Sequence, residues 1–495
     1  MTLQTNGLSS GLKFFRFHFL AIATISAALV IPCLWHRRIE AGDLASHTYN
    51  AWLAQLIEQG KAPGLYTVWQ STNVLFDILL LQACKIFGFT AGPKIVVALC
   101  ALVFFWGVFS LVAATSGRVP WRLAPVIAML TYGYTFNMGF FNYYLSIGLA
   151  SLALALFWQA KRYDWLAGAL IFCLAVVAHP IGSLWCLATF AYVLVRRRVR
   201  GSWGLVVPVV AIAAFIALHW YLAHAASLGN AEINWLDRPF YFYNGLDQFV
   251  VYSARCKWFV SVLLTITGAW LAYEALEWRE YAPVRKRFFL WVEMYFLSFV
   301  IICLLPQDLR FDPTSSWMGL LVSRLTIIAA IFALCALSFL KPRILASAAL
   351  VTCGGFYFVF LYQDTAIVDR LEWNAEQITR QLPVGALVIP TIEPRSTRIP
   401  YIGHVVERAC IGHCFTYSNY EPSSRQFRVR VRQGSPVATA SNSESQDMEG
   451  GGYVVRTGDP LFINIYPCNP TDFAVLCMRR LSVGDQTGSE DEPGN

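Results

Sequence analysis

The chain has 495 residues, of which 57% are hydrophobic and only 14% are charged, and its mean hydropathy is +0.50. This composition excludes an ordinary soluble globular protein, whose core needs far less apolar sequence, and indicates a polytopic membrane protein. The net charge of +8 is carried by short basic clusters between apolar runs, so it indicates membrane topology and not nucleic-acid binding.

The first long apolar run, residues 19–35, follows Lys13 and Arg16 and has no clear small-x-small cleavage site after it. We therefore expect an uncleaved helix with a cytoplasmic N-terminus, which places residues 37–72 outside the cytoplasm. The next run, 73–89, is short for a membrane span and contains charged residues. We expect it to be a membrane-embedded or re-entrant helix.

About eleven apolar segments are predicted to cross the membrane, because this arrangement keeps the basic clusters in the cytoplasm and leaves the C-terminus outside. The segments are 19–35, 94–114, 122–136, 144–158, 165–178, 181–195, 205–222, 258–276, 288–305, 325–340 and 344–362. The clusters are Arg118 and Arg122; Lys161 and Arg162; Arg196, Arg197, Arg198 and Arg200; Arg279, Arg285, Lys286 and Arg287; and Lys341 and Arg343.

The composition becomes more polar from residue 364, which predicts a membrane domain over 1–363 and a small extracytoplasmic α/β domain over 364–483. The fold class is thus predicted to be an all-α polytopic membrane protein with a small C-terminal extracytoplasmic α/β domain. The pattern favours a helix and three strands in that domain, followed by a disordered tail. The helix is expected at 369–381, the strands within 382–390, 427–431 and 461–466, a mobile loop at 434–452 and the tail at 484–495.

Four of the 13 cysteines lie in this C-terminal region, at Cys410, Cys414, Cys468 and Cys477. An oxidising compartment outside the cytoplasm permits disulfides among them, although their pairing cannot be read from the sequence. His413 beside two of these cysteines suggests zinc, but strong zinc signatures pair two such units. Disulfides or free thiols are therefore favoured over a zinc site.

A polar stretch directly after the first apolar run, residues 42–50, is predicted to begin a helix. Asp43, His47 and Asn50 then lie at i, i+4 and i+7 and share one face, directed at water or a cleft. The opposite face carries Tyr49 among other apolar residues, a pattern typical of a helix that lies flat on a membrane.

Other polar elements are predicted on the same side of the membrane. They are the segment 137–143, His179 between two short spans, and the loop 307–324, which contains Arg310 and Arg324. Ionisable groups at membrane level are costly and indicate function. We therefore expect a functional site at the outer face.

Several features of the sequence are informative together. They are the first span, the external Gly-Asp-x-x-x-His stretch at 42–47, the Gly-Leu-Tyr and Asn-x-x-Phe-Asp sequences at 64–66 and 73–77, and the C-terminal cap. Combined with many spans, they resemble the GT-C superfamily of integral-membrane glycosyltransferases. In that superfamily an acidic residue of the first external loop is implicated in catalysis, and by position Asp43 matches it. The chain departs from the pattern in having Leu44 where many members have a second acidic residue.

A second departure lies in the next external loop, where another acidic residue is common but this chain has only Asn137 and Asn142. The resemblance implies a sugar donor carried on a polyprenyl phosphate, and a glycan, lipid or protein acceptor. It also implies a bacterial inner-membrane location with a periplasmic C-terminal domain.

The chemistry implied is inverting transfer, in which Asp43 as general base takes the proton of the acceptor hydroxyl. Arg324 is the first candidate to stabilise the departing phosphate, with Arg310 and His179 behind it. His47 and Asn50 complete the predicted substrate-binding set. No cofactor is implied and no metal ligands are predicted; a divalent metal is possible but not indicated, because a single Asp makes a poor site for a hard divalent ion.

Alternatives remain at this stage. Asp43 can be a helix N-cap, His179 can cap a span end, and Arg324 can be an interfacial anchor. Asp77 and Lys85 are too far apart to be i, i+4 partners and can pair elsewhere or act as coupling groups. The protein can also be a transporter or flippase, although no internal repeat is evident, or a non-catalytic membrane assembly protein.

Overall fold

The computed structural model describes residues 7–159, 162–199, 204, 206–239, 242–253, 255–276, 285–311, 318–392, 397–469 and 471–488. Of the basic residues used to predict the topology, Lys161, Arg200 and Arg279 lie outside these ranges. The chain divides into two compact units. A helical unit comprises Met1–Ile31, Ala98–Phe136 and Asn142–Phe360, and a mixed unit comprises Pro32–Val97, Asn137–Phe141 and Leu361–Asn495.

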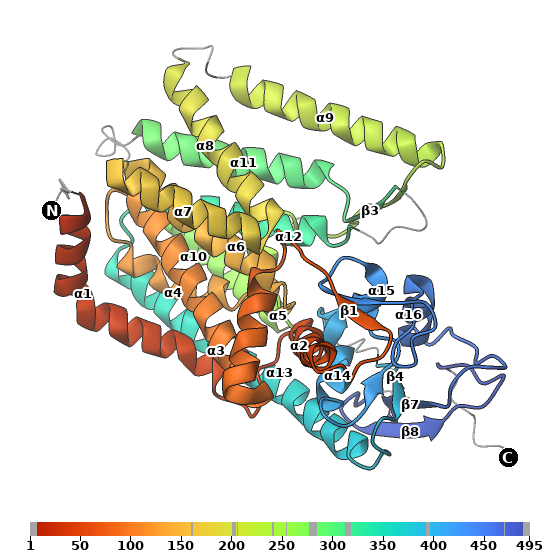
Figure 1. Ribbon diagram of the computed structural model, residues 1–495. Helices are drawn as coiled ribbons and strands as arrows, with labels where there is room; N and C mark the ends of the chain where they lie inside the picture. The colour runs from red at the N-terminus through yellow and green to blue at the C-terminus, as the bar shows by residue number, and fades with distance from the viewer. Residues whose placement is uncertain are drawn as a thin grey trace. The chain divides into compact units, whose positions relative to one another are not determined.

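The helical unit is built mainly from apolar helices (Figure 1). Its helices are α1 (Gly7–Val30), the second part of α3 (Leu75–Ser116), α4 (Ala124–Thr131), α5 (Tyr134–Asn137), α6 (Phe141–Gln159), α7 (Arg162–Ala178), α8 (Pro180–Arg198), α9 (Val206–Ser227), α10 (Cys256–Leu276), α11 (Arg285–Leu304), α12 (Leu321–Leu337) and the first part of α13 (Ile344–Thr379). A two-stranded antiparallel ribbon pairs β2 (Glu232–Asn234) with β3 (Asp308–Arg310).

Among the described residues, six helices are long and apolar enough to cross a membrane. They lie at Leu75–Ser116, Phe141–Trp158, Val206–Ser227, Cys256–Glu274, Arg285–Leu304 and Ile344–Thr379, and shorter apolar helices lie at His18–Cys33, Tyr163–Ala178 and Leu321–Leu337. These helices confirm the predicted fold class of an all-α polytopic membrane protein. The number of about eleven spans stays a prediction.

One predicted span, 122–136, is not a continuous helix. Helix α4 ends at Thr131, and the helical conformation is interrupted around Gly133 before the short helix α5. A Cβ atom at Gly133 would lie 2.8 Å from the carbonyl oxygen of Gln248, and the Gln248 Oε1 atom accepts the amide of Thr135. This close approach of a second segment ends the helix, and a hydropathy pattern contains no sign of it.

Helix α3 contains a break at Gly88, whose φ of 75° and ψ of 171° are non-helical. The break separates residues 75–87 from 89–116, as expected from the two apolar runs of the sequence. The first part, together with the residues up to Val97, belongs to the mixed unit, where Phe76 and Leu80 are fully buried. Its predicted position within the membrane stays a prediction.

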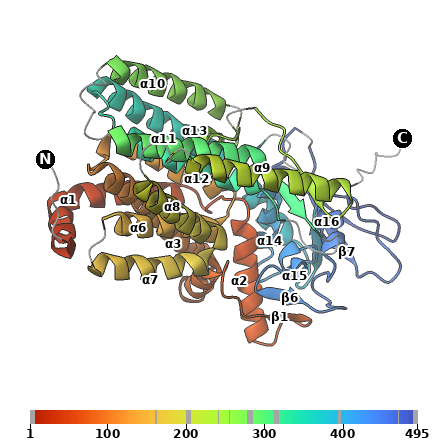
Figure 2. The same cartoon turned by 90° about the horizontal axis from the view of Figure 1, so that it is seen from above.

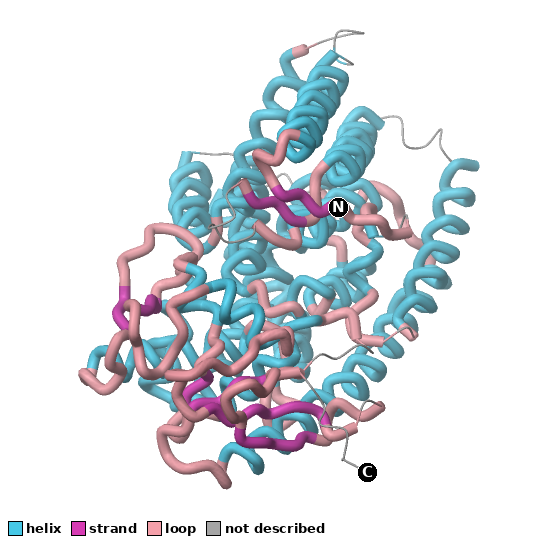
Figure 3. Tube along the Cα trace, turned by 90° about the vertical axis from the view of Figure 1, so that its right-hand side faces the viewer, coloured by secondary structure: helices cyan, strands magenta, loops and turns pink. Residues whose placement is uncertain are grey.

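The mixed unit contains the small α/β part that the sequence predicts. Its main sheet has the order β5 (Phe415–Thr416), β4 (Leu387–Pro390), β7 (Phe462–Pro467) and β8 (Leu476–Arg480). The first three of these strands are parallel, and β8 pairs antiparallel with β7. A second ribbon pairs β1 (Leu65–Thr67) with β6 (Val429–Val431). The three predicted strands correspond to β4, β6 and β7, and all described strands are short (Figure 3).

Short helices complete the mixed unit: α2 (Leu44–Glu58), α14 (Val405–Ala409), α15 (Tyr420–Ser424) and α16 (Asn442–Glu449). In two perpendicular views α2 lies beside α14 and α15 (Figure 1, Figure 2). Buried residues occupy every face of its first two turns, including Ala45 and Tyr49. The Trp52 ring stacks on Phe415, with centroids 5.5 Å apart. The prediction that this apolar face lies on a membrane is therefore wrong, because the C-terminal segment covers it.

The helix predicted at 369–381 is confirmed as the last part of α13, which ends at Thr379. Two further predictions differ from the structure. The segment 434–452, predicted to be a mobile loop, contains α16, which begins where the Ser441 side chain accepts the amide of Glu444. Residues 484–488, predicted to be disordered, form backbone hydrogen bonds with 451–455, and residues 489–495 lie outside the described ranges.

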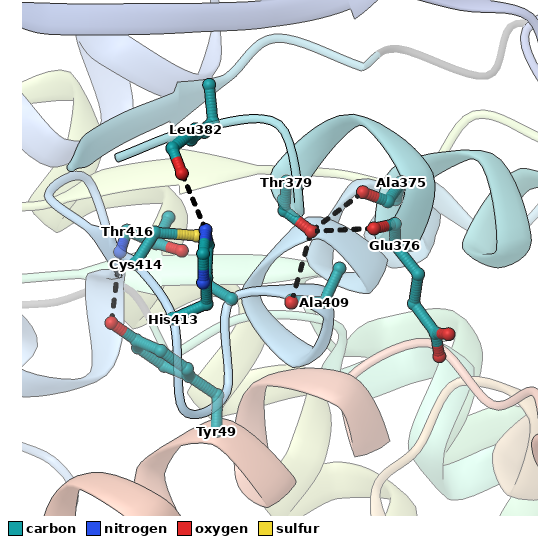
Figure 4. The surroundings of a disulfide bond; sticks show 10 residues. Tyr49, Ala375, Glu376, Thr379, Leu382, Ala409, His413, Cys414 and Thr416 are labelled. Carbon is teal, nitrogen blue, oxygen red and sulfur yellow. Dashed lines mark hydrogen bonds between the residues drawn. A yellow bond between two sulfur atoms is a disulfide. The ribbon is translucent and has the colours of Figure 1, made fainter. Parts of the chain in front are cut away.

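The four C-terminal cysteines form two disulfides, Cys410–Cys414 and Cys468–Cys477. This pairing confirms the preference for disulfides or free thiols over zinc and selects disulfides, and it removes the thiolates that a zinc site would need. The Nε2 atom of His413 instead donates to the carbonyl oxygen of Leu382, at 2.7 Å (Figure 4).

Candidate functional site

The N-terminal end of α2 is held by the loop that precedes α6. The amide of Gly42 donates to the carbonyl of Asn137 at 2.8 Å, and the amide of Asp43 donates to Met138 at 3.0 Å. Gly139 has a φ of +83°, and a Cβ atom there would lie 2.5 Å from the amide nitrogen of Asp43. The segment where the sequence lacks a second acidic residue thus fixes the backbone position of Asp43.

Asp43 occupies the N-cap position of α2 but does not cap it. Its backbone is helical, with φ of −65° and ψ of −11°, and its side chain makes no capping hydrogen bond. A capping residue needs an extended backbone to direct its oxygen at the first-turn amides, so the capping alternative does not apply here. The residue is 8% exposed, and its Oδ1 atom lies 3.8 Å from Nε2 of His404.

His404 belongs to a buried cluster with two carboxylates. Its Nδ1 atom lies 3.0 Å from Oε1 of Glu407, and the cluster also includes Glu449. Burial lowers the pKa of His404, but the carboxylates outweigh it, Glu407 first and then Glu449 and Asp43, and raise that pKa to about 10. Burial raises the pKa of Glu449 well above its usual range, with Glu407 adding to the effect.

The cluster opens onto a cavity of about 440 Å³. The ring of Tyr401 stacks on His404, with centroids 5.7 Å apart and planes inclined by 17°. The cavity is lined by Pro390, Ile392, Thr397, Arg398, Pro400, Tyr401, Gly403, His404, Glu449 and Gly450. It therefore combines an aromatic wall, the cationic group of Arg398 and the acidic group of Glu449, the kind of lining that a polar ligand such as a sugar needs.

His47 forms a second ionic cluster, on the same helix as Asp43. Its Nδ1 atom lies 2.9 Å from Oδ1 of Asp77 and 3.5 Å from Oε1 of Glu421, and Ser46 donates to the same Glu421 oxygen at 3.1 Å. Burial lowers the pKa of His47, but Asp77 first and then Glu421 raise it to about 10. Burial in turn raises the pKa of Glu421 to about 8. The imidazole of His47 is therefore paired with carboxylates of its own unit.

Asn50, also predicted to bind substrate, lies in the core of the unit. Its Oδ1 atom accepts from Nδ2 of Asn419 at 3.1 Å, and its own amide donates to the carbonyl of Ser46 at 3.0 Å. Asn50 is 5% exposed and Asn419 is fully buried. The pair joins α2 to the residue that caps α15, which is a structural role.

A third ionic group is centred on Arg408 and includes Glu40, which lies just before α2 in the sequence. Its guanidinium donates from Nε to Oε1 of Glu372 at 2.6 Å, and from Nη1 to the carbonyl of Ile39 at 3.1 Å. Its Nη2 atom contacts Glu372 and lies 3.3 Å from Oε2 of Glu40. All three charged side chains are almost completely buried. The network ties the connection before α2 to α13 and α14.

The remaining predicted residues belong to the helical unit. His179 caps α8, because its Nδ1 atom accepts the amide of Ile181 at 3.1 Å, as the structural alternative expected. Tyr143 contacts both His179 and Arg324. Its ring lies 5.4 Å from that of His179, and its hydroxyl donates to the backbone carbonyl of Arg324 at 2.7 Å. Arg310 is elsewhere, paired with Glu232 across the β2–β3 ribbon.

Sequence reasoning missed His404, Glu407, Glu421 and Glu449. One signal was present: His404 and Glu407 are spaced i, i+3, which places them on one face of a helical turn. Asp77 was seen only as an isolated charge in an apolar run. Its partner His47 is a member of the stretch from which the prediction started, but the two come together only in the folded unit.

No protein-family model matches the chain, and no curated protein matches it. Among solved structures, the chain is similar to the crystal structure of ArnT from Cupriavidus metallidurans in the apo state. The two share 12% sequence identity with a TM-score of 0.45, and the match covers 90% of this chain and 92% of that chain.

Proposed function

We propose that the protein is a membrane glycosyltransferase of the GT-C type. It transfers a sugar from a polyprenyl-phosphate carrier to an acceptor hydroxyl at the outer face of the membrane, with inversion at the anomeric carbon. Asp43 is the general base. The observation that carries this proposal is the buried Asp43 carboxylate, which does not cap its helix and lies 3.8 Å from His404, a residue that lines a cavity.

The surroundings of Asp43 hold its carboxylate in a defined position, as a general base requires. The loop at 137–139 fixes its backbone, and His404 lies 3.8 Å from one carboxylate oxygen. The Nε2 atom of His404 thus faces the carboxylate that accepts the proton of the acceptor hydroxyl. The proton moves to Asp43 as the hydroxyl oxygen attacks the anomeric carbon, and the bond to the phosphate oxygen breaks on the opposite face.

The phosphate that leaves carries a negative charge, which a planar guanidinium stabilises through two parallel hydrogen bonds. Within the mixed unit Arg398 lines the same cavity as His404, so we assign this role to it. Tyr401 supplies an aromatic face against which the apolar side of a sugar ring packs. The roles predicted for His179, Arg310 and Arg324 stay predictions.

The proposal is tested with purified full-length protein in detergent and a panel of polyprenyl-phosphate and polyprenyl-diphosphate sugars. Asp43→Asn keeps the size of the side chain but removes the base, so we expect sugar transfer to fall by about 10² to 10⁴-fold. The matched control is Glu58→Gln, at the exposed end of the same helix, whose carboxylate pairs with Lys85. Transfer by Asp43→Asn at the rate of the control would refute the assignment of the base.

Covalent transfer also separates this function from transport. The proposal expects a glycosylated acceptor, identified by mass spectrometry, and release of the carrier phosphate. Movement of a substrate across proteoliposomes by wild-type protein, without any covalent product, would refute it.

A further inference from the structure

We propose that His404, Glu407 and Glu449 bind one divalent transition-metal ion, Zn²⁺ or Mn²⁺. The three ligands do not include Asp43, and the test is metal binding itself, so its outcome does not depend on the proposed sugar transfer. All three residues belong to the mixed unit.

The local structure brings the three side chains together. His404 directly precedes α14 and Glu407 lies in its first turn, so their spacing of i, i+3 places both on one face. Glu449 is the last residue of α16. Glu449 is therefore distant from the other two residues in the sequence, and only folding brings its side chain next to theirs.

The distances match a single coordination shell. One ligand atom from each residue lies within 4.8 Å of the others, and Nδ1 of His404 is 3.0 Å from Oε1 of Glu407. Ligands at about 2.0–2.4 Å from a metal ion are separated by roughly 3 Å when adjacent and by up to about twice the bond length when opposite. An ion placed among the three atoms can therefore reach all of them without a rearrangement of the backbone.

An independent observation also points to a ligand. Glu407 is 0% exposed, and its second oxygen, Oε2, has no hydrogen-bond donor among the described residues. Glu449 is half-buried, but its Oε1 atom is buried and also has no hydrogen-bond donor among the described residues. Buried carboxylate oxygens almost always have a partner, because an unsatisfied one costs several kcal/mol, on the order of the desolvation of a charge. A cation in the cluster would satisfy both oxygens at once.

The donor set selects the kind of ion. One imidazole with carboxylates favours Zn²⁺ or Mn²⁺, whereas Mg²⁺ and Ca²⁺ prefer oxygen ligands alone. The cysteines nearest in sequence, Cys410 and Cys414, are joined in a disulfide, so no thiolate from them competes for the ion. His404 and Glu449 line the cavity of about 440 Å³, which provides a path of entry.

Asp43 would act as the outer partner of this site. Metal binding at Nδ1 of His404 leaves the proton on Nε2, and that atom lies 3.8 Å from Oδ1 of Asp43. Histidine ligands usually donate their second ring N–H to a carboxylate, which fixes the tautomer and the ring orientation. The bound ion would thus orient the imidazole toward Asp43, which makes His404 a positioning residue for that carboxylate.

The test uses full-length protein purified without a polyhistidine tag, stripped with a chelator and dialysed into metal-free buffer. Titration with ZnCl₂ or MnCl₂ in a calorimeter is expected to show about one high-affinity equivalent. Glu407→Gln and His404→Gln are each expected to weaken binding by at least about tenfold. Glu444→Gln on α16 and His413→Gln, which alter neighbouring residues of the same kinds, are the controls and should bind as the wild type does.

A measurement on the wild type alone covers the case in which a variant fails to fold. Zinc-edge X-ray absorption of the loaded protein is expected to show imidazole nitrogen and carboxylate oxygen, without sulfur. Absence of a high-affinity equivalent, sulfur in the first shell, or affinity unchanged in Glu407→Gln would each overturn the proposal.

Discussion

Replacement of Arg408 by Met is expected to be among the most destabilising single changes in the mixed unit. Arg408 donates hydrogen bonds to Oε1 of Glu372 at 2.6 Å, to the carbonyl of Ile39 at 3.1 Å and to Glu40 at 3.3 Å, and a further one to Oε2 of Glu372. Met has a similar volume but no charge, so the variant leaves Glu40 and Glu372 buried without Arg408, and only Arg38, 3.6 Å from Glu372, remains as a cation for that carboxylate.

The expected size follows from burial. The side chains of Arg408, Glu372 and Glu40 are 5%, 1% and 2% exposed, so solvent screens their interactions little. Removal of one partner from such a buried pair typically costs about 3–5 kcal/mol. Burial and the proximity of Glu372 hold the pKa of Glu40 well above its usual range, so Glu40 can become neutral by taking up a proton. Most of the cost therefore falls on Glu372.

The same reasoning predicts a partial rescue. Arg408→Met/Glu372→Leu removes the buried Arg408–Glu372 pair as a whole and leaves Glu40, whose raised pKa favours its neutral form, so the double variant is expected to recover more than half of the loss, roughly 2 kcal/mol or more. Thermal unfolding in detergent measures both variants, and for a unit of about 200 residues a loss of 3–5 kcal/mol corresponds to a shift of roughly 6–20 °C in Tm. A loss below about 1 kcal/mol in the single variant, or none recovered in the double variant, would refute the reasoning.

Two further predictions concern α2. Burial lowers the pKa of His47 but the carboxylates, Asp77 first, raise it from 6.5 to about 10, so its stabilising contribution is full below pH 6.5 and is lost as the pH rises toward 10. The free energy of unfolding of the wild type, measured against pH, should therefore exceed that of His47→Asn by an amount that shrinks by up to ~1.4 kcal/mol per pH unit from about pH 6.5 to 8. A difference that stays constant with pH would contradict this. Gly139→Ala places a Cβ atom 2.5 Å from the amide nitrogen of Asp43 and should reduce sugar transfer more than Gly60→Ala, where φ is also positive but no atom lies within 4 Å. Equal activity of the two glycine variants in the transfer assay would count against the role of this loop.

The sequence predicted the elements that depend on local composition. Long apolar runs became helices, the polar C-terminal region became an α/β part, and its cysteines became disulfides. The break in α3 at Gly88 separates the two runs that hydropathy distinguished. These features follow from residue type and spacing over a few turns, which a single sequence contains in full.

Other features depended on segments distant in the chain. Helix α2 has a polar and an apolar face, a pattern that in isolation indicates a helix at a surface. In the folded unit the polar face meets Asn419 and Glu421, and the apolar face meets Phe415 and the amide of Thr416, whose partner Tyr49 is 367 residues away in the chain. Amphipathicity specifies that two environments differ, and it does not specify what covers each one.

The sequence by itself determined the class of the protein, the position of Asp43 after the first apolar helix, and the helix on which Asp43 lies. Only the tertiary structure decided that Asp43 is buried beside His404 and that Glu407 and Glu449 accompany it. The physical reason is that hydropathy and helical periodicity are local sums over neighbouring residues. A buried ionic site is instead a set of pairings between distant segments, each chosen because a buried charge requires a partner.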